Sequence, residues 1–342
     1  MKFKFRRLCL LALAAGMAFA SGAQAQTTLQ FNRWLPPGHF LQTGVLEEWA
    51  KDVEKATEGR VKIQVTASSL GPPPRQYDLV RQGVAGIAWG VPGYTPGRFL
   101  TTEGVELPFL GNSAEAMSVA FWRTYKKHFE QAGEFKDVKL LTLHTHTPGE
   151  LFSNTKPLKT LDNIKGMKIR IINPATAEMT EALGGVAVSA PSSKAYELLS
   201  KGVVDATFLT ADAVPQFKLM DYVNHQMEVE GGFFNAAFFL VMNKKVWDGL
   251  SKADQAAIEK LSGETLAARA GRAWDNQRAI GQKELEAKGV TTVEVTGAEL
   301  EALKKKVAEV EQNWIEAVSK KGVDGKAALE MIRTEAAHYR AN

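Results

Sequence analysis

Two series of alternating strands and helices constrain the fold of this chain more than any other feature of its sequence. Residues 29–89 and residues 167–208 each follow the order strand, helix, strand, helix, strand, and their strands are rich in apolar residues. Strands that alternate with helices of this size form parallel sheets covered by helices. A chain of 342 residues also exceeds the size at which one hydrophobic core usually stops growing. The sequence therefore predicts an α/β fold with two lobes.

The C-terminal third is predominantly helical. Residues 251–288 contain no proline and carry apolar residues at helical spacing. If this helix is continuous, its roughly 38 residues span about 57 Å, enough to cross both lobes. Gly263, Gly271 and Gly281 are the positions at which we expect it to bend. A second helix presents one apolar stripe over 300–317, and a last helix completes the chain.

The N-terminal segment predicts export. A basic start precedes an apolar run over 8–20, and two small residues separated by one position follow, ending at Ala25. This order is typical of a secretory signal peptide that is cleaved between Ala25 and Gln26. The apolar run is shorter than the about 20 residues that a membrane-spanning helix needs. We therefore expect an exported protein with residues 1–25 as its signal peptide and no membrane-spanning segment.

The same segment carries the whole net charge. The chain has a net charge of +4, and four basic residues with no acidic residue lie within the signal segment, so the remaining chain is neutral. Nucleic-acid binding, which depends on a basic surface, therefore loses its electrostatic support. The only cysteine, Cys9, also lies in this segment, so the exported chain needs no disulfide chemistry.

Arg170 is the strongest candidate for a ligand-binding residue. It lies near the carboxyl end of a strand, opposite that strand's apolar residues, and Asn173 is placed to cap the helix that Pro174 opens. Open α/β sheets bind ligands at this edge, and the guanidinium fork of arginine matches both oxygens of a carboxylate. The sequence predicts an anion site at Arg170 and Asn173. The alternative is a surface arginine paired with a local acid.

Two turns of the first series carry further candidates. Trp34 and His39 flank the turn between the first strand and its helix, and Trp89 and Tyr94 flank a glycine-containing loop at a later strand end. If the two lobes are built alike, both turns face the same cleft as Arg170. His39 would then donate to an anion, whereas its alternative role is to cap or pack. The aromatic residues either contact the ligand or pack within the lobe.

His144 and His146 lie on one face of a strand, a spacing that can ligate a metal. No cysteine and no third histidine at a metal-like spacing accompanies them in the exported chain, so we predict no metal and no cofactor. Nucleophile elbows, phosphate loops and dinucleotide-binding fingerprints are also missing from the sequence. We therefore predict a protein that is not an enzyme, with an exported metal-dependent hydrolase as the less favoured alternative.

Six short motifs follow one another along the chain. They are Trp34-Leu-Pro-Pro-Gly-His39, Pro92-Gly-Tyr-Thr-Pro-Gly-Arg-Phe99, Glu106-Leu-Pro-Phe109, Ile164-Lys-Gly-Met-Lys-Ile-Arg170, Gly202-Val-Val-Asp205 and Val241-Met-Asn-Lys-Lys245. Together they resemble the substrate-binding proteins of TRAP transporters, the periplasmic receptors of tripartite secondary transporters for organic acids. The resemblance covers essentially the whole exported chain. It implies a two-lobed periplasmic binding protein of the type II kind, with hinge strands and a long lobe-spanning helix, in which Arg170 holds the ligand carboxylate.

Two departures from the family pattern bear on the ligand. Many members that bind sialic acid or C4-dicarboxylates carry a second arginine where this chain has Gly149, and a frequent asparagine of the family is replaced by an apolar stretch with Phe208 and Leu209. One cation instead of two favours a monocarboxylate. The apolar replacement, together with Phe233 and its aromatic neighbour, favours a hydrophobic or aromatic ligand body. We predict an aromatic or short hydroxylated monocarboxylate.

The resemblance also divides the chain. We assign 26–147 and about 236–275 to lobe I, and 148–235 and about 276–342 to lobe II. We expect the lobes to rotate about hinge segments and to close over a bound acid. These hinge segments lie near 144–150, 207–213 and 231–240.

Trp34, His39, Tyr94 and His146 would complete the closed cage, and membrane permease subunits would then recognise the closed receptor. A cation that bridges the ligand is not indicated, although Asp212 or Glu228 would be placed to assist one. The binding protein of an ATP-driven importer is the alternative of the same architecture, but it would usually lack the long lobe-spanning helix.

Overall fold

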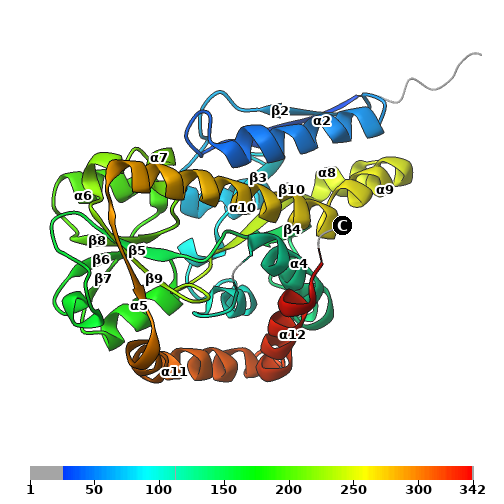
Figure 1. Cartoon of the computed structure of the whole chain (residues 1–342). Coiled ribbons are helices and arrows are strands. Elements are labelled where there is room, and N and C mark those ends of the chain that lie inside the picture. Colours follow the sequence, from blue (N-terminus) through cyan, green and yellow to red (C-terminus); the bar gives the residue numbers. More distant parts are fainter. Residues whose placement is uncertain (1–25, 112, 341–342) are drawn as a thin grey trace, which may run out of the picture.

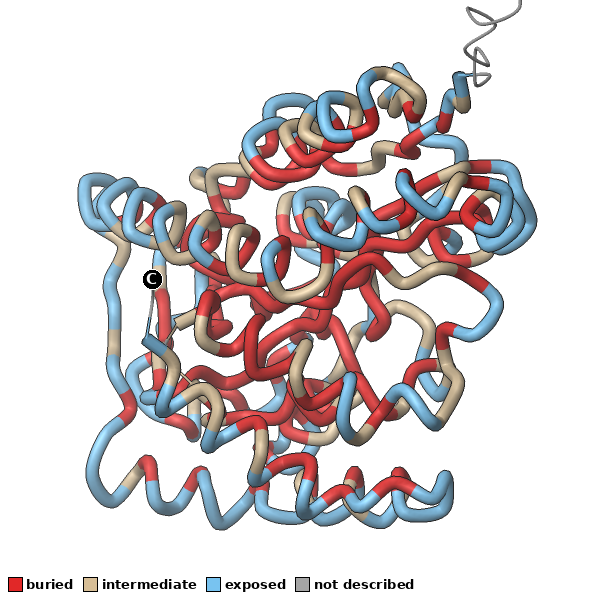
Figure 2. The backbone as a smooth tube through the Cα atoms, turned by 90° about the vertical axis from the view of Figure 1, so that its right-hand side faces the viewer, coloured by how far each residue is buried: buried red, intermediate tan, exposed pale blue. Residues whose placement is uncertain are grey.

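The computed structural model describes residues 26–111 and 113–340, so the signal peptide predicted for residues 1–25 lies outside the described residues. The described chain forms two sheets, each flanked by helices (Figure 1). Buried backbone is concentrated in the strands at the centre of the molecule, and the outer helices expose one side (Figure 2). The predicted two-lobed α/β fold is confirmed. No helix of the described residues is long and apolar enough to cross a membrane.

The first lobe is built on a five-stranded sheet in the order β2-β1-β3-β10-β4. The first series of the sequence supplies three parallel strands, as predicted. The fourth, β10, comes from much later in the chain and lies antiparallel between β3 and β4. It has neighbouring strands on both sides and is buried along its whole length. The strands are β1 (Thr27–Asn32), β2 (Val61–Val65), β3 (Ile87–Gly90), β4 (Val138–Thr145) and β10 (Ala237–Asn243).

The second lobe is built on a six-stranded sheet in the order β11-β9-β5-β8-β6-β7. The second series supplies β6, β7 and β8, which pair in parallel, while β5 runs antiparallel to both β8 and β9. The strands are β5 (Glu150–Ser153), β6 (Lys168–Ile171), β7 (Val186–Ser189), β8 (Ala206–Leu209), β9 (His225–Val229) and β11 (Thr291–Val295).

Short helices connect the strands of both lobes. In the first lobe, the helix predicted over 41–57 begins as a π-helical turn, η1 (Leu41–Leu46), and continues as α2 (Glu47–Ala56). The other helices of the first lobe are α3 (Gln76–Arg81), α4 (Ala114–Thr124), α8 (Lys244–Gly249) and α9 (Lys252–Leu261). Those of the second lobe are α5 (Pro174–Ala182), α6 (Ala195–Ser200) and α7 (Ala213–Gln216). Among the shorter turns, η3 (Pro92–Tyr94), η4 (Leu100–Glu106) and η8 (Ser192–Lys194) lie near the space between the lobes.

Two extended segments cross between the lobes, one from β4 to β5 and the other from β9 to β10. They pair where they pass: the Gly149 amide donates to the Phe234 carbonyl at 2.8 Å, and the Phe233 amide donates to the Gly149 carbonyl at 2.9 Å. The segment 207–213, which we expected to be a third hinge, connects β8 to α7 and stays in the second lobe.

The helix expected over 251–288 is broken. Ser262 has an extended backbone and Gly263 has a φ of 59°, a left-handed conformation that glycine adopts readily. The chain therefore forms α9 and then α10 (Gly263–Lys288), and α10 alone packs on both lobes, against α4 and β4 of the first and α7 of the second.

We expected α10 to bend at Gly271 and Gly281, but it does not. These two glycines instead let the helix approach the two lobes. A Cβ at Gly271 would lie 2.6 Å from the Glu115 amide nitrogen, where α4 begins. A Cβ at Gly281 would lie 2.6 Å from the Asp212 Cα in the second lobe. Each glycine is therefore a point at which the helix backbone lies directly on one lobe.

The helix α11 (Gly297–Ser319) crosses back from the second lobe to the first. Its buried residues are Leu300, Leu303, Val307, Val310, Trp314 and Val318, so the apolar stripe is as predicted up to Trp314, and Val318 is buried where Ala317 was expected. The last helix, α12 (Gly325–His338), packs on α4 (Figure 1). It thus lies with the first lobe, whereas residues 276–342 were assigned to lobe II. The sequence could not place this helix because its apolar face suits either lobe.

We expect Gly281→Ala to lower the free energy of unfolding by about 1–3 kcal/mol, because the added methyl group meets backbone that cannot rotate away. Urea denaturation would measure this loss. Gly44→Ala is the matched control: it lies in η1, an added Cβ meets nothing within 4 Å, and it should raise stability by up to about 1 kcal/mol. Equal effects of the two substitutions would contradict close packing at Gly281.

Candidate functional site

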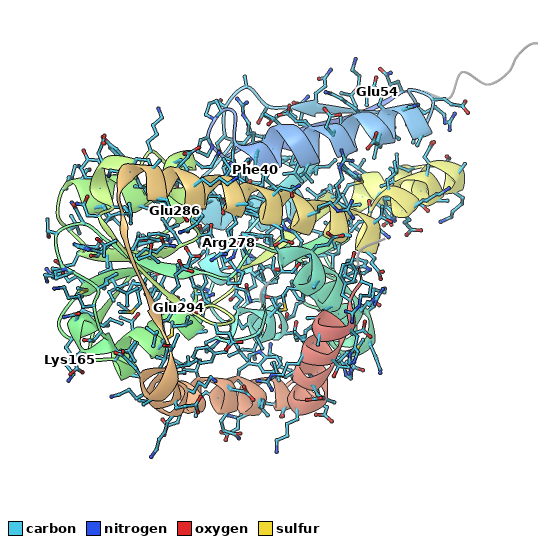
Figure 3. The ribbon with its side chains drawn as sticks, viewed as in Figure 1. Phe40, Glu54, Lys165, Arg278, Glu286 and Glu294 are labelled. Carbon is cyan, nitrogen blue, oxygen red and sulfur yellow. The ribbon has the colours of Figure 1, made fainter. Side chains whose placement is uncertain are left out.

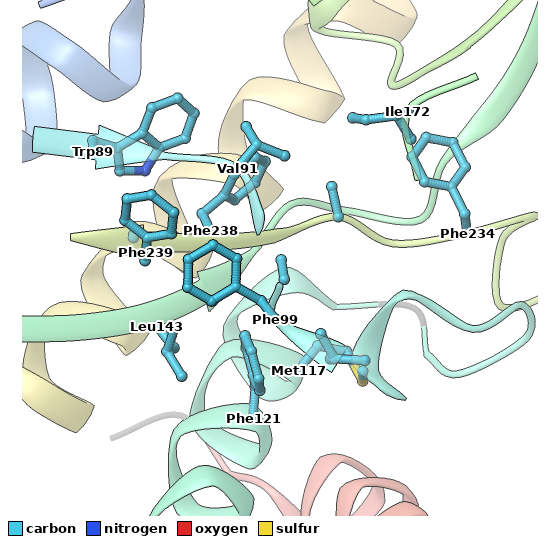
Figure 4. Packing of buried hydrophobic residues seen from close by; sticks show 14 of the residues in the cluster. Trp89, Val91, Phe99, Met117, Phe121, Leu143, Ile172, Phe234, Phe238 and Phe239 are labelled. Atoms are coloured by element: carbon cyan, nitrogen blue, oxygen red, sulfur yellow. The ribbon is translucent and has the colours of Figure 1, made fainter. Parts of the chain in front are cut away.

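A largely apolar cavity lies between the two lobes, and its lining side chains leave a free volume of about 40 Å³. Both lobes, the crossing segments and α10 contribute side chains to it. Figure 4 shows Trp89, Val91 and Phe238 from the first lobe on one side, and Ile172 and Phe234 on the other. The mostly aromatic lining suits a ligand with an apolar body.

Seven of the ten residues that the sequence singled out line this cavity. They are Trp34, His39, Trp89, Tyr94, His146, Phe208 and Leu209. The turns that carry them lie at the ends of β1, β3, β4 and β8, and these strand ends face one another across the space between the lobes.

The other three residues lie behind the lining. Asn173 caps α5, because its Oδ1 accepts the Thr176 amide at 2.9 Å. Phe233 packs its ring 5.7 Å from that of Phe208 and is fully buried. Arg170 is completely buried next to the lining residues Phe208 and Tyr94.

Phe234, which the sequence indicated together with Phe233 as part of an aromatic ligand environment, lines the cavity from the segment that leads into β10. Trp274 of α10 and Phe238 of β10 also line it, and neither was singled out from the sequence. Trp274 stacks on Phe238 with ring centroids 5.6 Å apart and an interplanar angle of 10°. The available signal for Phe238 was the aromatic-rich, largely apolar run that contains it. Trp274 carried none, since a tryptophan on a helix is usually a packing residue.

Arg170 holds a buried positive charge without an acidic partner among the described residues. Its Nε donates to the Ala190 carbonyl and its Nη1 donates to the Phe208 carbonyl, both at 2.8 Å. Its Nη2 is buried and has no hydrogen-bond partner among the described residues. Burial lowers the pKa of Arg170, and the Tyr94 hydroxyl opposes this effect. An anion beside Nη2 would satisfy both the charge and the free donor.

Tyr94 joins the two lobes directly. Its hydroxyl accepts the Ser192 amide at 2.9 Å and donates to the Ser192 Oγ at 3.1 Å. Close by, a Cβ at Gly93 would lie 2.8 Å from the Asn173 Cβ. The turn η3 of the first lobe is therefore in contact with the second lobe. This contact closes the cavity where Tyr94 meets Ser192.

His144 and His146, whose spacing would allow them to ligate a metal, have separate surroundings. The Nε2 of His144 accepts the indole N–H of Trp89 at 2.9 Å, and His144 does not line the cavity. His146 lines the cavity and packs its ring 5.2 Å from that of Phe234. Within residues 26–111 and 113–340, no group of three or more His, Cys, Asp or Glu residues is arranged to hold a metal ion.

Gly149 has no room for a side chain. A Cβ at this position would overlap the ring of Phe234, which lies directly on the glycine. The position for which the family resemblance implied a second arginine in dicarboxylate-binding members is thus covered here by an aromatic side chain that lines the cavity. The cavity therefore has aromatic walls, with one cation, Arg170, buried behind them.

A second cation, Arg278 of α10, occupies the acidic region that we considered for a bridging metal. It points from α10 toward the strands of the second lobe (Figure 3) and pairs with Glu150 and Glu228. Burial raises the pKa of Asp212 to about 7, whereas the Thr210 hydroxyl and the more distant Arg278 lower it. Asp212 and Glu228 are both neighbours of this guanidinium and belong to the contact between α10 and the second lobe.

Comparisons with known proteins agree with one another. Residues 31–317 match the family model DctP, described as bacterial extracellular solute-binding protein, family 7. The outer membrane transporter protein TsaT of Comamonas testosteroni is 34% identical over 337 residues, which cover 98% of this chain and 99% of that protein.

Solved structures of similar proteins share the architecture. A TRAP periplasmic solute-binding protein from Bordetella bronchiseptica, with bound (R)- and (S)-mandelate, is 36% identical with a TM-score of 0.88, and the match covers 91% of this chain and 99% of that one. A TRAP solute-binding protein from Rhodoferax ferrireducens, in complex with copurified benzoate, is 31% identical with a TM-score of 0.85, and the match covers 91% and 98%.

We expect the variant Asp212→Asn to gain stability relative to the wild type as the pH rises. The pKa of Asp212 is about 7 in the folded protein against an ordinary value of 3.8, so the folded state holds this proton more tightly than the unfolded chain. The free energy of unfolding of the wild type therefore falls between these two values as the pH rises. Between pH 5 and pH 8 the advantage of Asp212→Asn should grow by about 1–3 kcal/mol in urea denaturation.

Asp248→Asn is the control for this experiment, because Asp248 is exposed and paired with Lys244 on α8. Its effect on stability should be the same at both pH values. A pH-independent effect of Asp212→Asn would show that the buried carboxyl keeps an ordinary pKa.

Proposed function

This chain belongs to family 7 of the bacterial extracellular solute-binding proteins, the DctP family of TRAP transporter receptors, and we propose that it is a periplasmic receptor for an aromatic or hydroxylated monocarboxylate. In this proposal Arg170 binds the carboxylate, the aromatic cavity holds the ligand body, and the two lobes close over it. The observation that carries the proposal is the buried Arg170 guanidinium, which has a free donor and no acid beside it among the described residues.

The surroundings of Arg170 favour one carboxylate over two. Arg278, a partly exposed cation of α10, is already paired with Glu150 and Glu228. The side chain that covers Gly149 is the ring of Phe234, which offers no charge to a second carboxylate. An acid with one carboxylate and an apolar body therefore matches the cavity better than a C4-dicarboxylate.

The ligands of similar proteins support this class. The Bordetella bronchiseptica protein holds mandelate and the Rhodoferax ferrireducens protein holds benzoate, and both are aromatic monocarboxylates. Their sequence identities of 36% and 31% over nearly the whole chain make the same ligand class the first to test here.

The position of the cavity supports the proposed lobe closure. Its lining comes from both lobes, so a ligand inside contacts both and stabilises the closed arrangement to the extent that these contacts are better than those in an open one. The crossing segments around Gly149 and Phe234 are the places where backbone rotation would separate the lobes. The contact of Tyr94 with Ser192 would form on closure.

We further propose that this receptor is cleaved near Ala25, acts in the periplasm, delivers its ligand to membrane permease subunits, and makes or breaks no covalent bond. The family match supports this role over that of an ATP-driven importer receptor. The exported hydrolase is disfavoured because His144 is paired with Trp89 and lies outside the cavity lining.

Substitution of Arg170 tests the carboxylate role. We expect benzoate or mandelate to stabilise the wild type by about 2.7 kcal/mol at 100 times the dissociation constant, seen as a shift of the melting temperature. Arg170→Met should weaken binding at least about 100-fold in calorimetric titrations, because a buried charge-assisted contact is lost. Arg170→Lys keeps the positive charge but loses the two-pronged guanidinium group, so its ligand affinity should lie between those of the wild type and Arg170→Met.

Arg75→Met, at an exposed position, serves as the control and should bind like the wild type. A wild type that binds only C4-dicarboxylates would overturn the proposed ligand class. Unchanged affinity in a folded Arg170→Met variant would remove Arg170 from the site.

Substitution of Tyr94 tests closure. Tyr94→Phe retains the ring in the cavity but loses both hydrogen bonds to Ser192. We expect the ligand to dissociate faster and the affinity to fall about tenfold, since the closed form alone contains these bonds. Stopped-flow measurement of intrinsic tryptophan fluorescence would report the dissociation rate. An unchanged rate would mean that the Tyr94–Ser192 contact does not contribute to the ligand-bound state.

A further inference from the structure

Most polar groups of the side chains that line the cavity have a hydrogen-bond partner within the described residues, and the exceptions are on His39, His146 and Trp274. The hydroxyls of Tyr94 and Ser192 bond to each other. The indole N–H of Trp34 donates to the Trp89 carbonyl, and the indole N–H of Trp89 donates to His144. The imidazoles of His39 and His146 each keep one ring nitrogen, Nε2, without a partner among the described residues.

The partners of the other ring nitrogens fix the protonation of both imidazoles. The Nδ1 of His39 accepts the Leu41 amide at 3.3 Å, so the proton of this ring is on Nε2. The Nδ1 of His146 faces the Thr147 carbonyl, which can only accept, so it carries the proton and leaves a lone pair on Nε2. Burial lowers the pKa of both rings to about 4, so both are neutral near neutral pH. One free nitrogen is therefore a donor and the other an acceptor.

Both imidazoles contact the same side chain. Trp274 packs its ring 6.1 Å from that of His39 and 5.9 Å from that of His146, in both cases edge to face. The indole N–H of Trp274 is itself buried without a partner. His146 is linked to Arg170 through two aromatic neighbours: Arg170 Nη1 donates to the Phe208 carbonyl, and the rings of Phe208 and His146 both pack against Phe234. Within the part of the chain that the structure describes, the cavity thus presents one unpaired acceptor, the Nε2 of His146, and two unpaired donors, the N–H groups of His39 and Trp274. Arg170, the cation for the carboxylate, lies behind the lining.

A carboxylate cannot satisfy this arrangement, because it has no proton to give to the lone pair of His146. An ammonium group could donate but would be repelled by the nearby Arg170. A neutral hydroxyl both donates one hydrogen bond and accepts others, so it matches the lone pair of His146 together with the donor of His39 or Trp274.

We propose that His146 and His39 form a hydroxyl-binding subsite, so that the receptor prefers aromatic monocarboxylates that carry a hydroxyl group over the same acids without one. This inference rests on the proposed function, since it presumes a carboxylate at Arg170. Without the hydroxyl, the lone pair of His146 and the N–H donor of His39 have no partner in the cavity, which disfavours the plain acid.

The test compares two matched pairs of probes, mandelate with phenylacetate and 3-hydroxybenzoate with benzoate, by isothermal titration calorimetry. For at least one pair, we expect the wild type to bind the hydroxylated acid about tenfold or more tightly. His146→Leu should remove this preference, so that the hydroxylated acid and the plain acid of that pair bind with affinities within about threefold of each other. His146→Gln, which can place an amide oxygen near the former Nε2, should restore part of the preference.

His128→Leu is the control, because it removes a histidine outside the cavity lining and should retain the wild-type preference. Equal affinities within both pairs in the wild type would overturn the subsite while the receptor function stands. A preference that survives in a folded His146→Leu variant would also overturn it. Failure of the wild type to bind any of the four acids would instead reject the proposed ligand class, and the subsite with it.

Discussion

The rest of this molecule depends on the close contact between Gly149 and Phe234. The two backbone hydrogen bonds there pair the segments that connect the sheets, so they fix where each lobe begins. Because Gly149 has no side chain, the Phe234 ring lies on it and reaches the cavity, where it contacts His146 and Phe208. The contact that joins the lobes therefore also supplies part of the wall that surrounds a ligand, and any side chain at Gly149 would disturb both.

Local patterns in the sequence predicted the elements that depend mainly on local chemistry. The spacing of apolar residues along the sequence predicted the parallel strands, and capping chemistry predicted the role of Asn173. Side-chain alternation along the strand predicted the placement of Arg170. The turns with Trp34 and Tyr94 could be placed at the cavity because equivalent strand ends of two similar lobes face one shared cleft.

Features that depend on distant contacts could not be predicted in the same way. The insertion of β10 between β3 and β4, the break at Ser262 and the docking of α12 on α4 are decided by which surface is available after the chain has folded. Trp274 is the clearest case: its apolar spacing was visible, but its place in the cavity depends on how α10 lies across both lobes.

Arg170 shows how the site can be stable without its ligand. A buried charge is costly, and here two backbone carbonyls, those of Ala190 and Phe208, accept from it in place of a carboxylate. Such acceptors offset part of the desolvation cost and hold the guanidinium in one orientation, while Nη2 stays free. The protein thus keeps an oriented cation in an apolar environment, where its attraction for an anion is stronger than it would be in water.

The two glycines of α10 limit how the lobes can move. Gly271 lies on the first lobe and Gly281 on the second, and ten residues of α-helix between them span about 15 Å. A helix does not stretch, so this distance is the same in every arrangement that keeps both contacts. The lobes can rotate about α10 but cannot move apart along it. The helix is therefore a rigid axis that limits opening of the cleft to a rotation.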